Sequence, residues 1–372
     1  MNEQGSLAKK LATFGIAALC FGYFASYVPY SMMTKMITKG LCLGLDGKGL
    51  TGFQIQPIAV LGSFVAMYTF ISLKGWWKHC THSKIFGISF PRPQWFTFLS
   101  GICTSGQIIT TTLAYTFDGI SIVFAMLLMR GGVLMMAPII DLIVKKRRRH
   151  IYWPSWIAAV LALCALLVGY SSKAGTALTV IATIDILLYL TGYFFRLYIM
   201  SSRAKSADAA ERKRYFAEEQ LVANPLLFFA LLIVGLFGMG NGTGTITGQI
   251  WSGFSQIPFQ GFFIYIFLLG VFSYGTGLFG SLIYLDKREN TFTVPANRAA
   301  SVIAGVVATY LLAIFYGQRY PGTHELVGAA IIIGAIAFLT YRQVVEKRAK
   351  TAQETLRRCS GQAQATPATQ TT

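Results

Sequence analysis

Two arginines lie inside long apolar stretches of the sequence, where a charged side chain is unexpected. Arg130 lies in the stretch 119–144, and Arg298 lies in the stretch 291–315. An ionised side chain held at the depth of a lipid bilayer is costly unless it meets a counter-charge, a water-filled cavity or a substrate. We therefore predict that both guanidinium groups line a cavity and bind the anionic part of a ligand.

Two structural alternatives compete with ligand binding at these arginines. Each could pair with an intramembrane carboxylate such as Asp185, or its side chain could snorkel to the membrane surface. Asp185 is itself a candidate for binding a coupling proton or ion, with a structural salt bridge as the alternative. It precedes Arg196 by eleven residues, about 16 Å along a helix, so these two side chains cannot pair directly.

The stretches around the two arginines are related to each other. A shift of 168 positions places Arg130 on Arg298, and it also superimposes two further pairs, Asp118 on Asp286 and Tyr170 on Phe338. A shift of 170 places the triplet Gly-Tyr-Phe around Tyr23 on the same triplet around Tyr193. We predict an internal repeat from these matches.

The composition is that of a membrane protein with many spans. Hydrophobic residues make up 54% of the chain and charged residues 12%, and the mean hydropathy is +0.54. A bilayer needs roughly 20 apolar residues per helical span, and the chain supplies about ten such runs. They lie near 12–33, 53–73, 94–117, 119–144, 151–171, 177–200, 219–239, 260–285, 291–316 and 323–341.

The predicted fold is therefore an all-α polytopic membrane protein with two five-helix repeats, 12–171 and 177–341. Because five spans is an odd number, the second repeat must enter the membrane from the opposite side. Inverted repeats of this kind place a substrate site near the middle of the membrane, at the interface between the halves.

The net charge of +18 is concentrated on one side of the predicted spans. Basic residues precede the first span and follow the even-numbered ones, most densely in the run KKRRR at 145–149. By the positive-inside rule, both termini are cytoplasmic, including the segment 1–11 and a disordered tail at 342–372. This distribution explains the charge without nucleic acid. We expect a multi-pass protein of a bacterial inner membrane, or of the Golgi or ER membrane in a eukaryote.

Polar and small residues distinguish three of the spans. Gln107 in the third span and Tyr274 in the eighth are long enough to reach into a cavity. Small residues at steps of four in the eighth span favour close helix packing; these are Ser273, Gly277 and Ser281. In the ninth span, alanines recur at 296, 300, 304 and 308. Arg298 and Ser301 lie on the face opposite that alanine stripe.

The ten spans and two motifs resemble the drug/metabolite transporter superfamily, which includes EamA-like exporters and the nucleotide-sugar and triose-phosphate transporters. The motifs are AMLLMRGG at 125–132 and GAAIIIG at 328–334. This resemblance implies a central cavity lined mainly by spans three, four, eight and nine. It also implies that cationic residues there, Arg130 and Arg298, hold phosphate or carboxylate.

The sequence thus predicts a secondary transporter that moves a small polar, anionic metabolite by alternating access. Arg130 and Arg298 would bind the anionic group. The orienting hydrogen bonds are assigned to Gln107, Tyr274, Asn297 and Ser301, and the aromatic cover to Tyr23 and Tyr193.

The alternative is a non-transporting membrane receptor or assembly protein with a vestigial cavity. No hydrolase or metalloprotease motif is present, so we expect no enzyme activity, no cofactor and no metal site. The expected partners are the lipid bilayer, the metabolite, and a coupling proton or an exchanged anion. Homodimer formation is left open.

Overall fold

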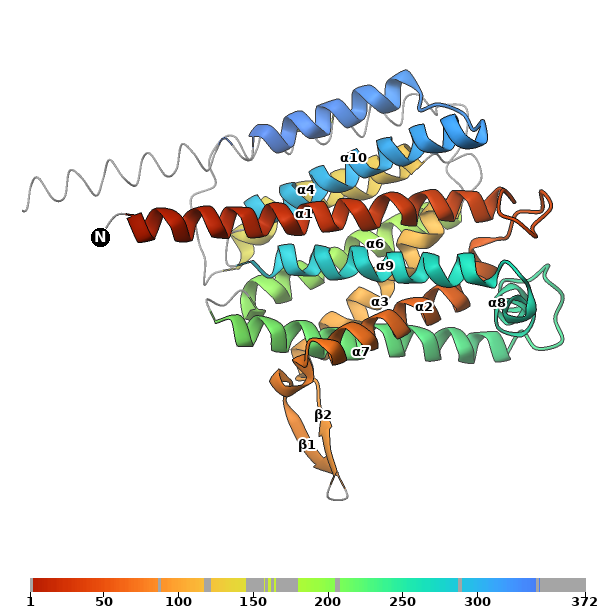
Figure 1. Ribbon diagram of the computed structural model, residues 1–372, viewed down its shortest axis with the longest axis horizontal. Helices are drawn as coiled ribbons and strands as arrows, with labels where there is room; N and C mark the ends of the chain where they lie inside the picture. Colours follow the sequence, from red (N-terminus) through yellow and green to blue (C-terminus); the bar gives the residue numbers. More distant parts are fainter. Residues whose placement is uncertain are drawn as a thin grey trace, which may run out of the picture.

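A computed structural model shows a bundle of long helices that run alongside one another (Figure 1). It describes residues 3–85, 88–116, 122–144, 157, 160–161, 164, 180–204, 208–286, 290–338 and 341. The long helices are α1 (Glu3–Thr38), α2 (Gly52–Leu73), α3 (Trp95–Thr116), α4 (Ile122–Ile143), α6 (Val180–Ile199), α7 (Ala209–Leu236), α9 (Phe263–Tyr284) and α10 (Asn290–Tyr316). A shorter apolar helix follows at Thr323–Phe338.

Six helices in the described part of the chain are long and apolar enough to cross a membrane. They lie within α1, α2, α6 with the π-helical turn Met200–Ala204, α7, α9 and α10. The chain is therefore a mostly helical membrane protein, as its composition predicts. The predicted fifth span at 151–171, the basic run at 145–149, Asp118 and Tyr170 lie wholly or almost wholly outside the described residues, as does the tail 342–372.

Two connections contain structure that was not predicted. Between α2 and α3, the 3-10 turn Trp76–His79 leads into a two-stranded antiparallel hairpin, β1 (His82–Ile85) and β2 (Ile88–Pro91). Between α7 and α9 lie the short helix α8 (Ile246–Ser255) and the 3-10 turn Ile257–Phe259. The hairpin was not predicted because strands of four residues are too short to give a recognisable period in the sequence.

Helices α2 and α9 approach each other closely. Gly62 of α2 faces Gly270 of α9, and a Cβ atom added to Gly270 would lie only 2.0 Å from the carbonyl oxygen of Ala59. The Ser63 hydroxyl donates a hydrogen bond of 2.7 Å to the Gly270 carbonyl. Glycine is needed at both positions because the two backbones approach too closely for a side chain.

Gly270→Ala is expected to destabilise the protein by about 1–3 kcal/mol, because the extra methyl group forces α2 and α9 apart. The matched control is Gly277→Ala on the same helix, since a Cβ atom there would have no heavy atom within 4 Å. Thermal unfolding in detergent compares the two variants. Equal stability of Gly270→Ala and Gly277→Ala would contradict the close contact.

Candidate functional site

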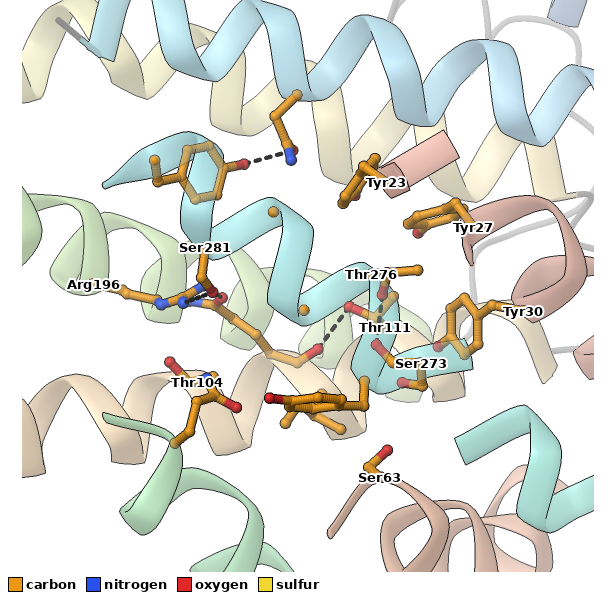
Figure 2. A pocket seen from close by; sticks show the side chains of 18 of the residues that line it. Tyr23, Tyr27, Tyr30, Ser63, Thr104, Thr111, Arg196, Ser273, Thr276 and Ser281 are labelled. Carbon is orange, nitrogen blue, oxygen red and sulfur yellow. Dashed lines mark hydrogen bonds between the residues drawn. The ribbon is translucent and has the colours of Figure 1, made fainter. Parts of the chain in front are cut away.

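A cavity lies in the interior of the bundle, bounded by residues of α1, α2, α3, α4, α6, α7, α9 and α10. The cavity has a volume of about 70 Å³. Figure 2 shows Tyr23, Tyr27 and Tyr30 of α1 along one wall, with Arg196 and Ser281 together on the opposite side. The cavity accommodates an anionic group or a small molecule rather than a bulky one.

Arg130 lines this cavity, and tyrosines hold its guanidinium group. The group donates hydrogen bonds to the hydroxyls of Tyr27 and Tyr189. The guanidinium carbon lies 5.3 Å from the centre of the Tyr27 ring and 5.6 Å from the centre of the Tyr189 ring. Arg130 is only 2% exposed. The predicted placement at a cavity therefore holds for this residue, in a setting of hydroxyls and aromatic faces.

Arg298 lies one layer behind the cavity wall. Its side chain is fully buried and donates hydrogen bonds to the hydroxyls of Tyr284 and Tyr189, the latter at 3.4 Å. Its guanidinium carbon stands 4.7 Å from the centre of the Tyr193 ring. Tyr193 and Tyr284 line the cavity while Arg298 does not, so the prediction that Arg298 itself lines it is corrected to a position behind these rings.

Neither structural alternative describes Arg298. A side chain with no exposed surface does not snorkel, and none of its contacts in the described part of the chain is with a carboxylate. Asp185 is 5% exposed, does not line the cavity, and has no ion pair within the described residues. Its Oδ2 atom is buried without a hydrogen-bond partner there. Asp185 therefore lies apart from the two arginines.

Three of the residues predicted to orient a ligand line the cavity, and each has a polar atom with no partner in the described structure. These atoms are Nε2 of Gln107, the hydroxyl of Tyr274 and Nδ2 of Asn297. Asn224 of α7 adds a fourth, its Oδ1 atom. Buried polar groups are rarely left unpaired, because each lost hydrogen bond costs about 1–3 kcal/mol. The cavity thus offers donors and an acceptor to a polar occupant.

The remaining predicted residues divide between the wall and the layer behind it. Tyr23 and Tyr193 line the cavity, as predicted for an aromatic cover. Ser301 is fully buried and does not line it; its hydroxyl donates a hydrogen bond of 2.8 Å to the Arg298 carbonyl. Ser301 thus lies behind the cavity wall, on the turn of α10 that carries Arg298.

A third buried arginine, Arg196, forms an ion pair that was not predicted. Its Nε and Nη2 atoms each lie 2.9 Å from one carboxylate oxygen of Glu219. Nη1 donates to Gln107 at 3.1 Å and Nη2 to Ser281 at 2.7 Å. Glu219 also accepts hydrogen bonds from Ser100 and Thr104 of α3. The pair is neutral overall, and each nitrogen of the guanidinium group donates at least one hydrogen bond.

The small residues of α9 have a different role from the one predicted. Ser273, Gly277 and Ser281 line the cavity, and the Gly277 position is open to it. Helix contact is made instead by Gly270, one turn before this stripe. The packing interpretation was wrong because spacing alone does not show whether a stripe of small residues faces a helix or a void.

Several tyrosines of the site were also missed: Tyr27, Tyr30, Tyr189 and Tyr284. Three of them belong to series of tyrosines at steps of three or four, at 23, 27 and 30 in α1 and at 189 and 193 in α6, whereas Tyr284 lies at the end of α9. Such a spacing puts their hydroxyls on one helix face and is a signal that the sequence contains. Among the described residues, no three His, Cys, Asp or Glu side chains gather as a metal site requires.

Comparisons with known proteins give no family for this chain. No protein-family model matches it. No curated protein matches it either. A solved structure described only as "Crystal structure of protein" is similar over 87% of this chain and 98% of its own, with 12% identity and a TM-score of 0.47.

Proposed function

We propose that the protein is a secondary transporter that carries a small polar anion through this cavity by alternating access. The observation that carries the proposal is a buried cavity in a membrane-spanning bundle, with the Arg130 guanidinium at its wall and that of Arg298 directly behind it. Both groups are held by tyrosine hydroxyls and rings.

The charge of Arg298 supports an anionic ligand. Arg196 is paired with Glu219, whereas the contacts of the Arg298 guanidinium group in the described part of the chain are with tyrosine side chains. Opposite charges in a low-dielectric interior attract strongly, so a positive charge next to a cavity in the bundle favours an anion inside it.

The unpaired polar atoms support a ligand that also carries hydroxyl or carbonyl groups. Gln107 and Asn297 present amide donors, Asn224 presents a carbonyl oxygen, and Tyr274 presents a hydroxyl. A ligand with several oxygens satisfies these atoms, whereas an apolar ligand leaves them unpaired. We therefore favour a small hydroxylated metabolite with a phosphate or carboxylate group.

The packing of the helices supports the inverted repeat that alternating access needs. If α1, α2, α3 and α4 correspond to α6, α7, α9 and α10, the contacts between halves occur in matched pairs. Helix α1 packs on α9 as α3 packs on α6, α2 packs on α9 as α3 packs on α7, and α1 packs on α10 as α4 packs on α6. Such a pattern is expected for two halves related by a pseudo-two-fold axis.

The directions of α2 and α7 agree with an inversion. Thr51, at the start of α2, bonds through its side chain to Gln249 of α8 at 2.8 Å, and α7 ends in the loop that leads to α8. One helix thus begins where the other ends. A shift of 168 also places the buried pair Gln56-Pro57 of α2 on Asn224-Pro225 of α7, the shift that relates Arg130 to Arg298.

On this basis we propose that the protein belongs to the drug/metabolite transporter superfamily, with ten spans and cytoplasmic termini. It rests on the motifs around Arg130 and at 328–334, and on the paired helix contacts. Within this proposal the substrate moves when one half of the bundle rocks against the other around the cavity.

The test is a thermal-unfolding screen of detergent-purified protein against phosphorylated sugars, nucleotide sugars, amino acids and organic acids. A ligand that binds only the folded state raises the unfolding temperature. We expect stabilisation by one anionic class, and uptake of that compound into proteoliposomes. If neutral or cationic compounds alone stabilise the protein, or if the stabilising anion is not taken up, the proposed function is wrong.

A further inference from the structure

We infer that the β1–β2 hairpin, with the turns that flank it, is a binding site for the headgroups of anionic lipids. The segment from Lys74 to Gln94 contains four Lys or Arg residues, two His and no Asp or Glu. Figure 1 shows the hairpin projecting sideways from the bundle, across the direction of the helices. The hairpin follows the end of α2, a helix long and apolar enough to cross a membrane, so a hairpin with this direction lies along the membrane surface.

The exposed side chains of this segment suit the boundary between lipid tails and headgroups. Phe90 of β2 is 48% exposed, and Trp95 at the start of α3 is 72% exposed. Lys84 of β1 and Arg92 after β2 are exposed as well. Aromatic rings favour the level of the headgroups, and basic side chains beside them attract phosphate and other anionic groups.

The base of the hairpin is rigidly attached to the bundle, which fixes its direction. Glu218 of α7 is fully buried, and its carboxylate accepts hydrogen bonds from the backbone and hydroxyl of Thr81 at 2.9 and 2.8 Å. It also accepts bonds from the backbone of Gln94 and the hydroxyl of Thr97. Both ends of the hairpin are therefore held by one carboxylate. A preformed site loses less freedom on binding than a flexible loop does.

The basic side chains of this surface favour anionic lipid over neutral lipid. Each basic side chain near an anionic membrane surface contributes about fivefold to association, which is about 1 kcal/mol. The test uses the full chain in neutral detergent, titrated with phosphatidylglycerol or with phosphatidylcholine of the same acyl chains. Binding is followed by the rise in unfolding temperature.

Removing two cations should selectively weaken this interaction. The double variant Lys84→Gln with Arg92→Gln is expected to bind phosphatidylglycerol at least about tenfold more weakly, with no change for phosphatidylcholine. The matched control is Lys48→Gln with Arg319→Gln. These exposed residues lie at the α8 end of the bundle, in the loops before α2 and after α10.

A second readout places the lipid at the hairpin. The fluorescence of Trp95 is the emission of the wild-type protein minus that of the Trp95→Phe variant. Brominated phosphatidylglycerol should quench this fluorescence more than brominated phosphatidylcholine does. Wild-type affinity for phosphatidylglycerol in the Lys84/Arg92 variant, or equal stabilisation by both lipids, overturns the inference. These outcomes do not bear on the cavity, so they are separable from failure of the proposed transport function.

Discussion

Replacing Glu219 by alanine is expected to destabilise the folded protein by about 3–5 kcal/mol, because it leaves the buried Arg196 guanidinium without its counter-charge. The Glu219 side chain is fully buried and that of Arg196 is 5% exposed, so water does not compensate for the loss. Ser100 and Thr104 lose an acceptor in the same step. The free energy of unfolding in detergent measures the effect.

A double-mutant cycle separates this ion pair from the packing around it. Arg196→Met with Glu219→Leu removes both charges and should be much closer to wild type in stability than either single variant. Glu218→Gln is the matched control for a buried glutamate at the adjacent position, since its partners are neutral. If Glu219→Leu and the double variant are equally unstable, the side chains act through packing and the ion pair is unimportant.

The positions of the helices could be predicted because a span is a local property of the sequence. An apolar run of sufficient length predicts a helix by itself, and the predicted runs at 53–73, 94–117 and 291–316 agree closely with α2, α3 and α10. The start of α7 could not be predicted this way. Its first turns are polar, so the predicted span began at 219, while the helix begins at Ala209.

The burial of Glu218 and Glu219 depends on partners that are distant in the sequence. Glu219 contacts Arg196 and α3, and Glu218 contacts the ends of the hairpin. The periodicity of the α7 sequence predicts neither contact. The same limit applies to Arg298. Its helix face was predicted, but whether that face meets the cavity or the rings of Tyr193 and Tyr284 depends on how α6 and α9 pack.

Arg130→Ala should weaken binding of the stabilising anion by at least about 30-fold, because losing one partner of a buried charge contact costs about 2–5 kcal/mol. Arg298→Ala should weaken it less, since Tyr193 and Tyr284 stand between this side chain and the cavity. Arg130→Lys should fall between wild type and Arg130→Ala, since lysine keeps the charge but not the planar fork that matches phosphate or carboxylate.

The order of these effects distinguishes direct contact from action through the field of the protein. Affinity is measured as the ligand-dependent rise in unfolding temperature, taken relative to each variant without ligand, so a change in stability alone does not imitate a loss of binding. Arg319→Ala removes the same charge from an exposed loop and should leave affinity unchanged. An Arg130→Ala variant that binds as wild type does would show that Arg130 is structural. If Arg298→Ala caused the greater loss, the anion would lie behind the tyrosines rather than in the cavity, and the site would have to be redrawn around α10.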